Sequence, residues 1–285
     1  MTDVGPGDRS SYRVDGELVP DPASRFQPEG PVGPSEIVDP DAFVWQAASW
    51  RGAQLEGQVI YELHIGTFTP GGTWRSALAR LPELARTGIS IVEVMPVGEF
   101  AGRFGWGYDG VFPFAPTRLY GTPDDFRVFV DGAPRAGLAV VLDVVYNHLG
   151  PSGCALRTFS DAYFTTRYEN EWADAIDFDG EQSAPVREYF AANAAYWIEE
   201  FRLDGLWLDV TQSKHDPACA RCGLSPGNRL GVARRSVRRR LAEDRSRRPG
   251  GRPARMPRGL RRASRGARHR HDQRDLRCGA PPLRR

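Results

Sequence analysis

Two aspartates in this chain end apolar runs, and polar residues that can bind sugar hydroxyls follow one of them. Asp143 ends such a run and is followed by Asn147 and His148, and Asp209 ends the next run. A carboxylate beside amide and imidazole groups can attack the anomeric carbon of a sugar, or stabilise the charge that develops there. Either aspartate alone is better explained as a loop cap or as the partner of a nearby cation. Two of them on successive apolar runs favour a site for sugar chemistry.

Alternating strands and helices are the elements that must position these residues. The predicted strands span residues 59–65, 89–95, 138–145 and 206–210, and the predicted helices span residues 73–86, 123–136 and 184–202. Thr73 and Thr122 stand where helix N-caps are expected, and Pro123 suits a first helical turn. The second strand is apolar almost throughout, as a strand buried on both faces should be. Strand, helix and strand at these spacings indicate parallel βαβ units.

The polar residues at the strand ends distinguish between the possible parallel folds. The turn after the first predicted strand, residues 66–72, does not fit the G-x-G-x-x-G pattern of a dinucleotide-binding sheet. Polar residues gather instead at the C-terminal ends of the strands, where His64 and Glu93 join the two aspartates. In a (β/α)8 barrel that face carries the chemistry. The predicted fold class is therefore α/β, with about four βα units, the first half of such a barrel, over residues 55–216.

The composition of the chain changes at about residue 217. Residues 1–216 contain all 30 aromatic residues, whereas residues 217–285 contain none. The second segment has 22 arginines against four acidic residues, a net charge of +18, and the first segment has a net charge of −16. A segment without large apolar side chains cannot form a core. We therefore expect residues 217–285 to be a disordered basic tail, and we interpret them as the product of a shifted reading frame in a GC-rich gene.

The first 54 residues are rich in Pro and Gly and show little periodicity. Residues 12–14 alternate like the end of a strand, and residues 21–30 suggest an extended linker. No apolar run approaches the ~20 residues that cross a membrane, and the N-terminus lacks the features of a secretory signal. Four cysteines in a chain of this size indicate a reducing compartment rather than a disulfide framework. We therefore expect a cytoplasmic protein that has no membrane partner.

Several separate motifs resemble glycoside hydrolase family 13, the α-amylase superfamily. Residues 143–148 (Asp-Val-Val-Tyr-Asn-His) match its first signature region, and residues 204–209 (Asp-Gly-Leu-Trp-Leu-Asp) match the second. Stretches that resemble the trehalose-releasing branch of this superfamily are residues 59–70, 104–112, 145–151, 163–168 and 209–213. The resemblance extends over about residues 15–216. It implies that residues 1–54 are the remnant of an N-terminal β-sandwich module with its linker, since relatives carry such a module before the barrel.

The resemblance also implies a reaction, a substrate and a set of site residues. The substrate would be maltooligosyl trehalose, an α-1,4-glucan that ends in a trehalose unit, and hydrolysis of the bond next to that unit would release trehalose. Asp209 would be the nucleophile of a retaining mechanism. The implied substrate contacts are Tyr108, Asp143, His148, Trp207 and Gln212, and Asn147 is implied to be structural. No ligand set for calcium accompanies Asn147, and we expect neither a metal nor a cofactor.

Two aromatic residues offer flat apolar faces to a sugar ring. Trp106 and Tyr108 lie in the stretch Phe-Gly-Trp-Gly-Tyr-Asp. Packing in the core explains Trp106 equally well, whereas the motif around Tyr108 favours stacking on a sugar.

The chain departs from the family pattern at three places. Trp207 stands where the family has an arginine, which would orient the nucleophile and keep its pKa low. The general-acid glutamate of the family follows the fifth strand. Glu243 is at about the right distance, but arginines surround it and no apolar strand would place it. The third acid of the family, on its seventh strand, has no counterpart. These departures predict that the activity of this chain is impaired or lost.

Other functions compete with the hydrolase. One is a catalytically dead remnant that keeps some affinity for glucans, and another is a 1,4-α-glucan branching enzyme, which the stretch at residues 147–151 argues against. A third is a nucleic-acid-binding arm, because a charge of +18 binds phosphates. The tail has no aromatic residues for base stacking, so we expect at most non-specific binding. Cys219 and Cys222 could form half of a zinc site, but the next possible ligands are too far along the chain, and free thiols are the better hypothesis.

Overall fold

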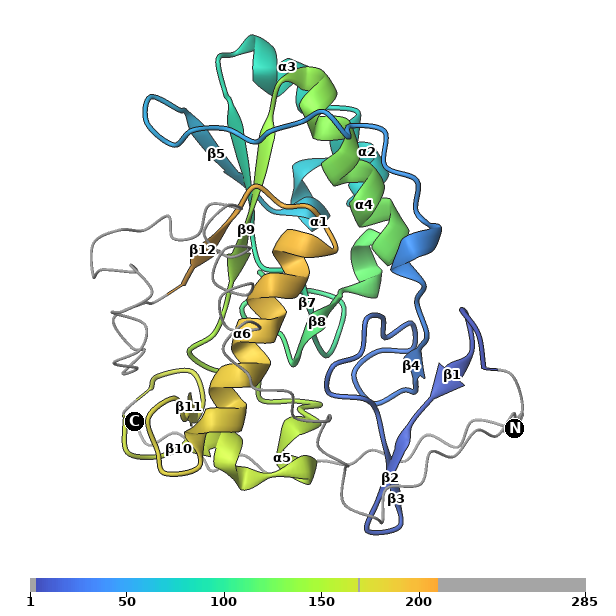
Figure 1. Cartoon of the computed structure of the whole chain (residues 1–285), viewed down its shortest axis with the longest axis vertical. Coiled ribbons are helices and arrows are strands. Elements are labelled where there is room, and N and C mark those ends of the chain that lie inside the picture. The colour runs from blue at the N-terminus through green and yellow to red at the C-terminus, as the bar shows by residue number, and fades with distance from the viewer. Residues whose placement is uncertain (1–3, 169, 210–285) are drawn as a thin grey trace, which may run out of the picture.

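The computed structural model describes residues 4–168 and 170–209, drawn in colour in Figure 1. Gln212, Glu243, the paired cysteines Cys219 and Cys222, and the whole basic tail of residues 217–285 lie outside these residues. Within the described part, no helix is long and apolar enough to cross a membrane.

A parallel four-stranded sheet forms the centre of the molecule. Its strands are β5 (Ile60–Leu63), β6 (Ile91–Val94), β9 (Ala139–Val144) and β12 (Gly205–Leu208), in the spatial order β12-β9-β6-β5. All three neighbouring pairs are parallel, so each strand lies beside the strand that precedes it in this series. This order is that of successive strands in a (β/α)8 barrel. The α/β class and the parallel βαβ units are therefore confirmed, as part of such a barrel.

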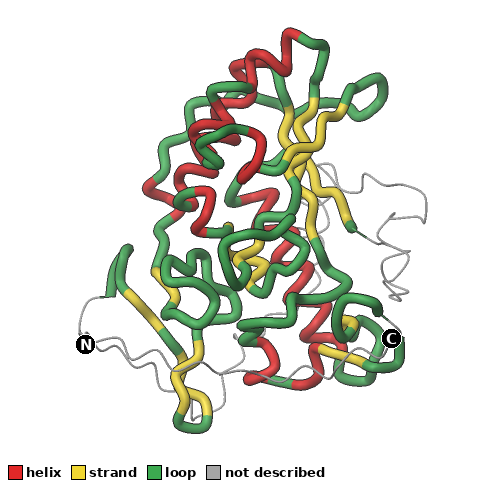
Figure 2. Tube along the Cα trace, turned by 180° about the vertical axis from the view of Figure 1, so that it is seen from behind, coloured by secondary structure: helices red, strands yellow, loops and turns green. Residues whose placement is uncertain are grey.

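Most of the helices lie along one side of the sheet, as both views show, whereas the helix labelled α5 lies below the sheet in Figure 1 (Figures 1 and 2). The longer ones are α4 (Pro123–Gly132) and α6 (Ser183–Glu199), and the others are α1 (Ile65–Phe68), α2 (Trp74–Leu78), α3 (Leu81–Arg86) and α5 (Leu156–Phe159). Thr73 and Thr122 cap α2 and α4, each in a reciprocal capping box. Both predicted N-caps are therefore confirmed.

The boundaries of several predicted elements were wrong, and three differences are instructive. The helix expected over residues 73–86 is two helices, because Pro82 lies in the first turn of α3, where its missing N–H is not needed. The strand expected over residues 59–65 ends at Leu63, and the next residues turn into α1. The helix expected over residues 123–136 is α-helical only to Gly132 and continues as the 3₁₀ helix η3 (Ala133–Ala136).

The two faces of the sheet contact different surroundings, because successive side chains in a strand point to opposite sides. One face packs under the helices in the main core, to which Val94, Leu142 and Leu206 belong. On the other face Ile91, Val141 and their neighbours form a small separate cluster. The first is called the outer face below and the second the inner face, as in a barrel.

The N-terminal segment consists of two small antiparallel ribbons. Strand β1 (Arg9–Ser10) pairs with β4 (Ser35–Glu36), and β2 (Tyr12–Val14) pairs with β3 (Glu17–Val19). Residues 21–30, expected to be an extended linker, contain no strand or helix, but Phe26 and Gln27 are buried, and Tyr189 of α6 donates a hydrogen bond to the carbonyl of Pro22. Residues 21–30 therefore pack against the helices that cover the sheet.

The remaining elements are short and connect the larger ones. They are β7 (Gly98–Glu99), β8 (Phe112–Pro116), β10 (Phe164–Thr165), β11 (Ala175–Ile176), and the 3₁₀ helices η1 (Pro40–Ala42), η2 (Arg118–Tyr120) and η4 (Asp161–Tyr163). Strands β7 and β8 pair with each other, as do β10 and β11.

Candidate active site

The two aspartates singled out in the sequence lie at the C-terminal ends of neighbouring strands. Asp143 is in β9, and Asp209 directly follows β12. The backbone N–H of Asp209 donates a hydrogen bond to the carbonyl of Val144 at 3.2 Å, which ties it to the end of β9. Burial raises the pKa values of Asp143 and Tyr108 and lowers that of His148, and the negative charge of Asp209 adds to the first two shifts and opposes the third. The structure therefore brings these four predicted site residues together.

Asp143 is buried and is held by a tyrosine. Only 3% of the residue is exposed, and the hydroxyl of Tyr108 donates a hydrogen bond of 2.9 Å to its Oδ2. Burial raises the pKa of Asp143 to about 7, against the lowering effect of this hydrogen bond. The pKa of Tyr108 is also raised, first by burial and then by the charge of Asp143. Tyr108 therefore remains a neutral donor that fixes the orientation of one carboxylate oxygen.

Two glycines allow close backbone contacts in the loops that carry Tyr108 and His148. Gly107 has a φ of +101°, and a Cβ atom there would lie 2.0 Å from the carbonyl oxygen of Pro96. A Cβ atom on Gly150 would lie 2.0 Å from the carbonyl oxygen of Asp109. The backbone N–H of Gly150 instead donates a hydrogen bond to the carbonyl of Gly110. Side chains at either glycine would separate the loops and move Tyr108 from Asp143.

His148 is buried and stacks on a tryptophan that the sequence analysis missed. Its ring lies 5.7 Å from the ring of Trp172, with an angle of 26° between the planes, and 54% of Trp172 is exposed. Burial lowers the pKa of His148, although the charges of Asp209 and Asp109 oppose this shift. Trp172 follows β10 by several residues in a loop without periodicity, so no pattern in the sequence connects it with His148.

Asn147 holds the loop of Trp172 through its backbone. Its carbonyl accepts a hydrogen bond from the side chain of Asn170 at 3.3 Å and another from the backbone N–H of Ile176 at 3.2 Å. The side chain of Asn147 is buried, and neither of its polar atoms has a hydrogen-bond partner among the described residues. The contacts of the backbone agree with a structural position for Asn147.

Trp207 lies on the inner face of the sheet, opposite Asp143 in the register of β12 and β9. Its side chain is partly buried and packs against the cluster of Ile91, Ala139 and Val141. Trp106 is 77% exposed, so the alternative that it packs in the core was wrong. His64 is held by groups of the protein, since its Nε2 is 2.9 Å from both the carbonyl oxygen of Gly105 and the hydroxyl of Tyr120.

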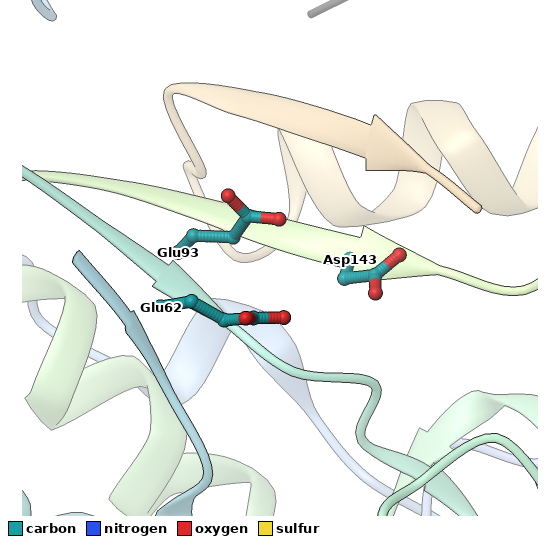
Figure 3. A group of neighbouring side chains, drawn as sticks. All are labelled: Glu62, Glu93 and Asp143. Atoms are coloured by element: carbon teal, nitrogen blue, oxygen red, sulfur yellow. The ribbon is translucent and has the colours of Figure 1, made fainter. Parts of the chain in front are cut away.

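A second glutamate, Glu62 of β5, joins Glu93 and Asp143 on the inner face (Figure 3). The ligand atoms of these three side chains all lie within 4.8 Å of one another. Burial, and then the charge of Glu62, raises the pKa of Glu93 to about 7. The sequence analysis singled out Glu93 but not Glu62, although Glu62 is two residues before His64 and therefore on the same face of its strand.

The arrangement combines a carboxylate at the mouth of a parallel sheet with buried groups that bind hydroxyls. In retaining glycosidases a second carboxyl group, ~5–5.5 Å from the nucleophile, protonates the leaving oxygen. The candidate for that role in the sequence, Glu243, lies outside the described residues. The described part of the site therefore contains a carboxylate, Asp209, at the end of a strand where it could contact a bound sugar.

Comparisons with known proteins identify similar chains. No protein-family model matches this chain. Curated malto-oligosyltrehalose trehalohydrolases are 39–47% identical to it. The one from Deinococcus radiodurans is 45% identical over 208 residues, which are 73% of this chain and 34% of that protein. A 1,4-alpha-glucan branching enzyme from Nocardia farcinica is 35% identical over 235 residues, 75% of this chain and 31% of that protein.

A solved structure agrees with the sequence comparison. The crystal structure of a protein from Salmonella typhimurium assigned as an α-amylase is 42% identical, with a TM-score of 0.73, and the match covers 86% of this chain and 40% of that one. The chain spans about a third of the length of the curated relatives it matches. The comparisons therefore bear out the resemblance to the α-amylase superfamily, and over 73% of its length the chain is similar to a malto-oligosyltrehalose trehalohydrolase.

Proposed function

We propose that this chain carries the nucleophile half of a retaining glycosidase site for maltooligosyl trehalose, and that its hydrolytic activity is impaired. The reaction would be hydrolysis of the α-1,4 bond next to the trehalose unit, with release of trehalose. One observation carries the proposal. Asp209 at the end of β12 is tied by its backbone to the end of β9, beside Asp143 and the tyrosine that donates to it, in a chain that is 45% identical to a trehalohydrolase.

The roles proposed for the residues follow from their positions. Asp209 would attack the anomeric carbon and form a covalent glycosyl intermediate, which water would then hydrolyse. Tyr108 would present its ring to the sugar, and its hydrogen bond to Asp143 would fix the ring. Burial keeps His148 neutral, so its imidazole could both donate and accept hydrogen bonds with hydroxyl groups. Trp207 and Gln212 would be further substrate contacts, and Asn147 would support the loop.

The impairment has a physical cause in two missing groups. An indole at position 207 cannot form the charge-assisted hydrogen bond that an arginine would form with a carboxylate. A general acid is typically worth ~10²–10⁴-fold in rate, and the candidate glutamate, Glu243, has only arginine-rich sequence around it. The low number of cysteines supports a cytoplasmic location for the reaction.

The test uses the full chain and maltooligosyl trehalose, with trehalose release and binding affinity measured on the same preparation. We expect saturable binding and trehalose release that is very slow and abolished in Asp209→Asn. The matched control is Asp41→Asn, which removes an exposed carboxylate from η1 and should release trehalose at the wild-type rate. Trehalose release that persists in Asp209→Asn would exclude its role as the nucleophile, and the absence of glucan binding would contradict the substrate.

Two other candidates give different products in the same assay. A branching enzyme, to which the chain is also similar, would create α-1,6 branch points in a linear α-glucan and release no trehalose. A dead remnant would bind the glucan without any turnover, and Trp207→Arg would not restore the reaction because the acid would still be missing.

A further inference from the structure

The three carboxylates on the inner face form a cluster that the sheet itself assembles. This acidic cluster consists of Glu62, Glu93 and Asp143, from β5, β6 and β9 (Figure 3). Glu62 and Glu93 face each other in the register of β5 and β6. Val141 of β9 faces Glu93, and Asp143 is two residues further along β9 on the same side. Their ligand atoms lie within 4.8 Å of one another, so the strand register brings three carboxyl groups close together.

Two of these carboxylates are buried and lack the partners that buried charges require. Only 3% of Asp143 is exposed, and its Oδ1 has no hydrogen-bond partner in the described part of the chain. Glu93 is only 7% exposed, and no described residue forms an ion pair with Glu62, Glu93 or Asp143. Buried charges in proteins are normally paired or coordinate a metal. The unpartnered Oδ1 of Asp143 thus points to a positively charged ligand.

The neighbouring strand does not supply this charge. Trp207 lies opposite Asp143 on β12, on the same face of the sheet. Its indole offers one N–H donor and no charge. Glu62 is exposed at the edge of the cluster, so the site is accessible to solvent from that side. A cation could therefore enter from water and keep part of its hydration shell.

Against the expectation from the sequence that the chain holds no metal, we propose that the acidic cluster binds a hard divalent cation, with Mg²⁺ as the best fit. Carboxylate oxygens are the ligands that Mg²⁺, Ca²⁺ and Mn²⁺ prefer. Three protein oxygens with water at the remaining positions suit Mg²⁺, which is reluctant to lose its water, whereas Ca²⁺ takes six to eight oxygen ligands. Oδ1 of Asp143 would be one ligand, since Tyr108 occupies Oδ2. The inference does not rest on the proposed hydrolase reaction.

In the first experiment the full chain is treated with EDTA and titrated with MgCl₂, and binding is measured by calorimetry and by thermal melting. Salt at about 0.15 M screens weak binding to surface charges. Hard ions also avoid the cysteines of the tail, which prefer softer metals. We expect one saturable site and a melting temperature that rises with Mg²⁺. Glu93→Gln, which keeps the shape and removes one charge, should weaken the affinity at least tenfold.

The control is Glu83→Gln, which removes a half-exposed carboxylate on α3 and should bind Mg²⁺ like the wild type. Absence of saturable binding of Mg²⁺, Mn²⁺ and Ca²⁺ to the wild type would overturn the proposal. So would wild-type affinity in Glu93→Gln.

A second pair of variants tests the same site without removing a carboxylate. Trp207→Arg places a guanidinium opposite Asp143, where it can pair with the cluster, and should weaken Mg²⁺ binding at least tenfold. Trp207→Phe keeps an uncharged ring at this position and should bind Mg²⁺ like the wild type. Circular dichroism verifies that both variants fold. Equal affinity for Mg²⁺ in the two variants would place the cation elsewhere and overturn the proposal.

Discussion

The outer and inner faces of the same four strands differ in almost every physical respect. On the outer face, side chains such as Val94 and Leu142 are buried under the helices in one continuous apolar core. On the inner face, a small apolar cluster around Val141 is followed toward the strand ends by carboxylates. Alternation along each strand creates this contrast, because adjacent residues face opposite sides. One face therefore supplies the stability of the fold, and the other carries carboxyl groups, Glu62, Glu93 and Asp143, that have no ion-pair partner in the described part.

The largest effect is expected from breaking the outer face. Trp74 is fully buried and stacks on Phe126 of α4, with the ring centroids 4.0 Å apart. We expect Trp74→Ala to lower the free energy of unfolding by about 3–5 kcal/mol, because it removes a large apolar surface and leaves a cavity. Urea denaturation followed by circular dichroism would measure this loss. A loss below about 1 kcal/mol would mean that the helices do not form a closely packed core.

A smaller effect is expected from the hydrogen bond that holds the inner face. Tyr108→Phe removes the donor to Oδ2 of Asp143 and leaves both oxygens of a buried carboxyl group without a described donor. We expect a loss of about 1–3 kcal/mol in the free energy of unfolding. The matched control is Tyr61→Phe, at a partly exposed tyrosine of β5, which should change the stability very little. Equal losses in the two variants would argue against this hydrogen bond.

Removal of an aromatic ring from the inner face should cost less than its removal from the outer face. Trp207 is only partly buried and contacts the small cluster around Val141. We therefore expect Trp207→Ala to lower the free energy of unfolding by about 1 kcal/mol or less, since the ring leaves no closed cavity. The same urea experiment would measure it. A loss as large as that of Trp74→Ala would remove the distinction between the two faces.

The smallest effect is a dependence of stability on pH through His148. Burial lowers the pKa of His148 below its ordinary value of 6.5, so the unfolded chain binds this proton more readily than the folded chain. The contribution of His148 to stability is therefore complete above the ordinary pKa and is lost as the pH falls through the lowered pKa. The free energy of unfolding is measured at pH 7.5 and at pH 5.5. The decrease from pH 7.5 to pH 5.5 should be larger in the wild type than in His148→Phe. A larger fall in His148→Phe would reverse the sign of this shift.

Part of the fold and of the site could be predicted because the signals are local. The strands appear as short apolar runs, and the caps Thr73 and Thr122 act on residues within the same turn. The break between α2 and α3 was missed because the apolar spacing continues past Pro82. Trp172 and Glu62 were missed for another reason. Their partners, His148 and the carboxylates of other strands, are distant in sequence, and no periodicity records such a contact.

The sequence by itself determined that Asp143 and Asp209 end neighbouring parallel strands, because period and composition decide which segments become buried strands. It also determined the departure at Trp207 and the unlike composition of the last 69 residues. Only the tertiary structure decided that Tyr108 donates to Asp143, that Trp106 is exposed and that three carboxylates meet on one face. The physical reason is that these contacts depend on strand register and on the approach of loops at Gly107 and Gly150, which join residues far apart in the chain.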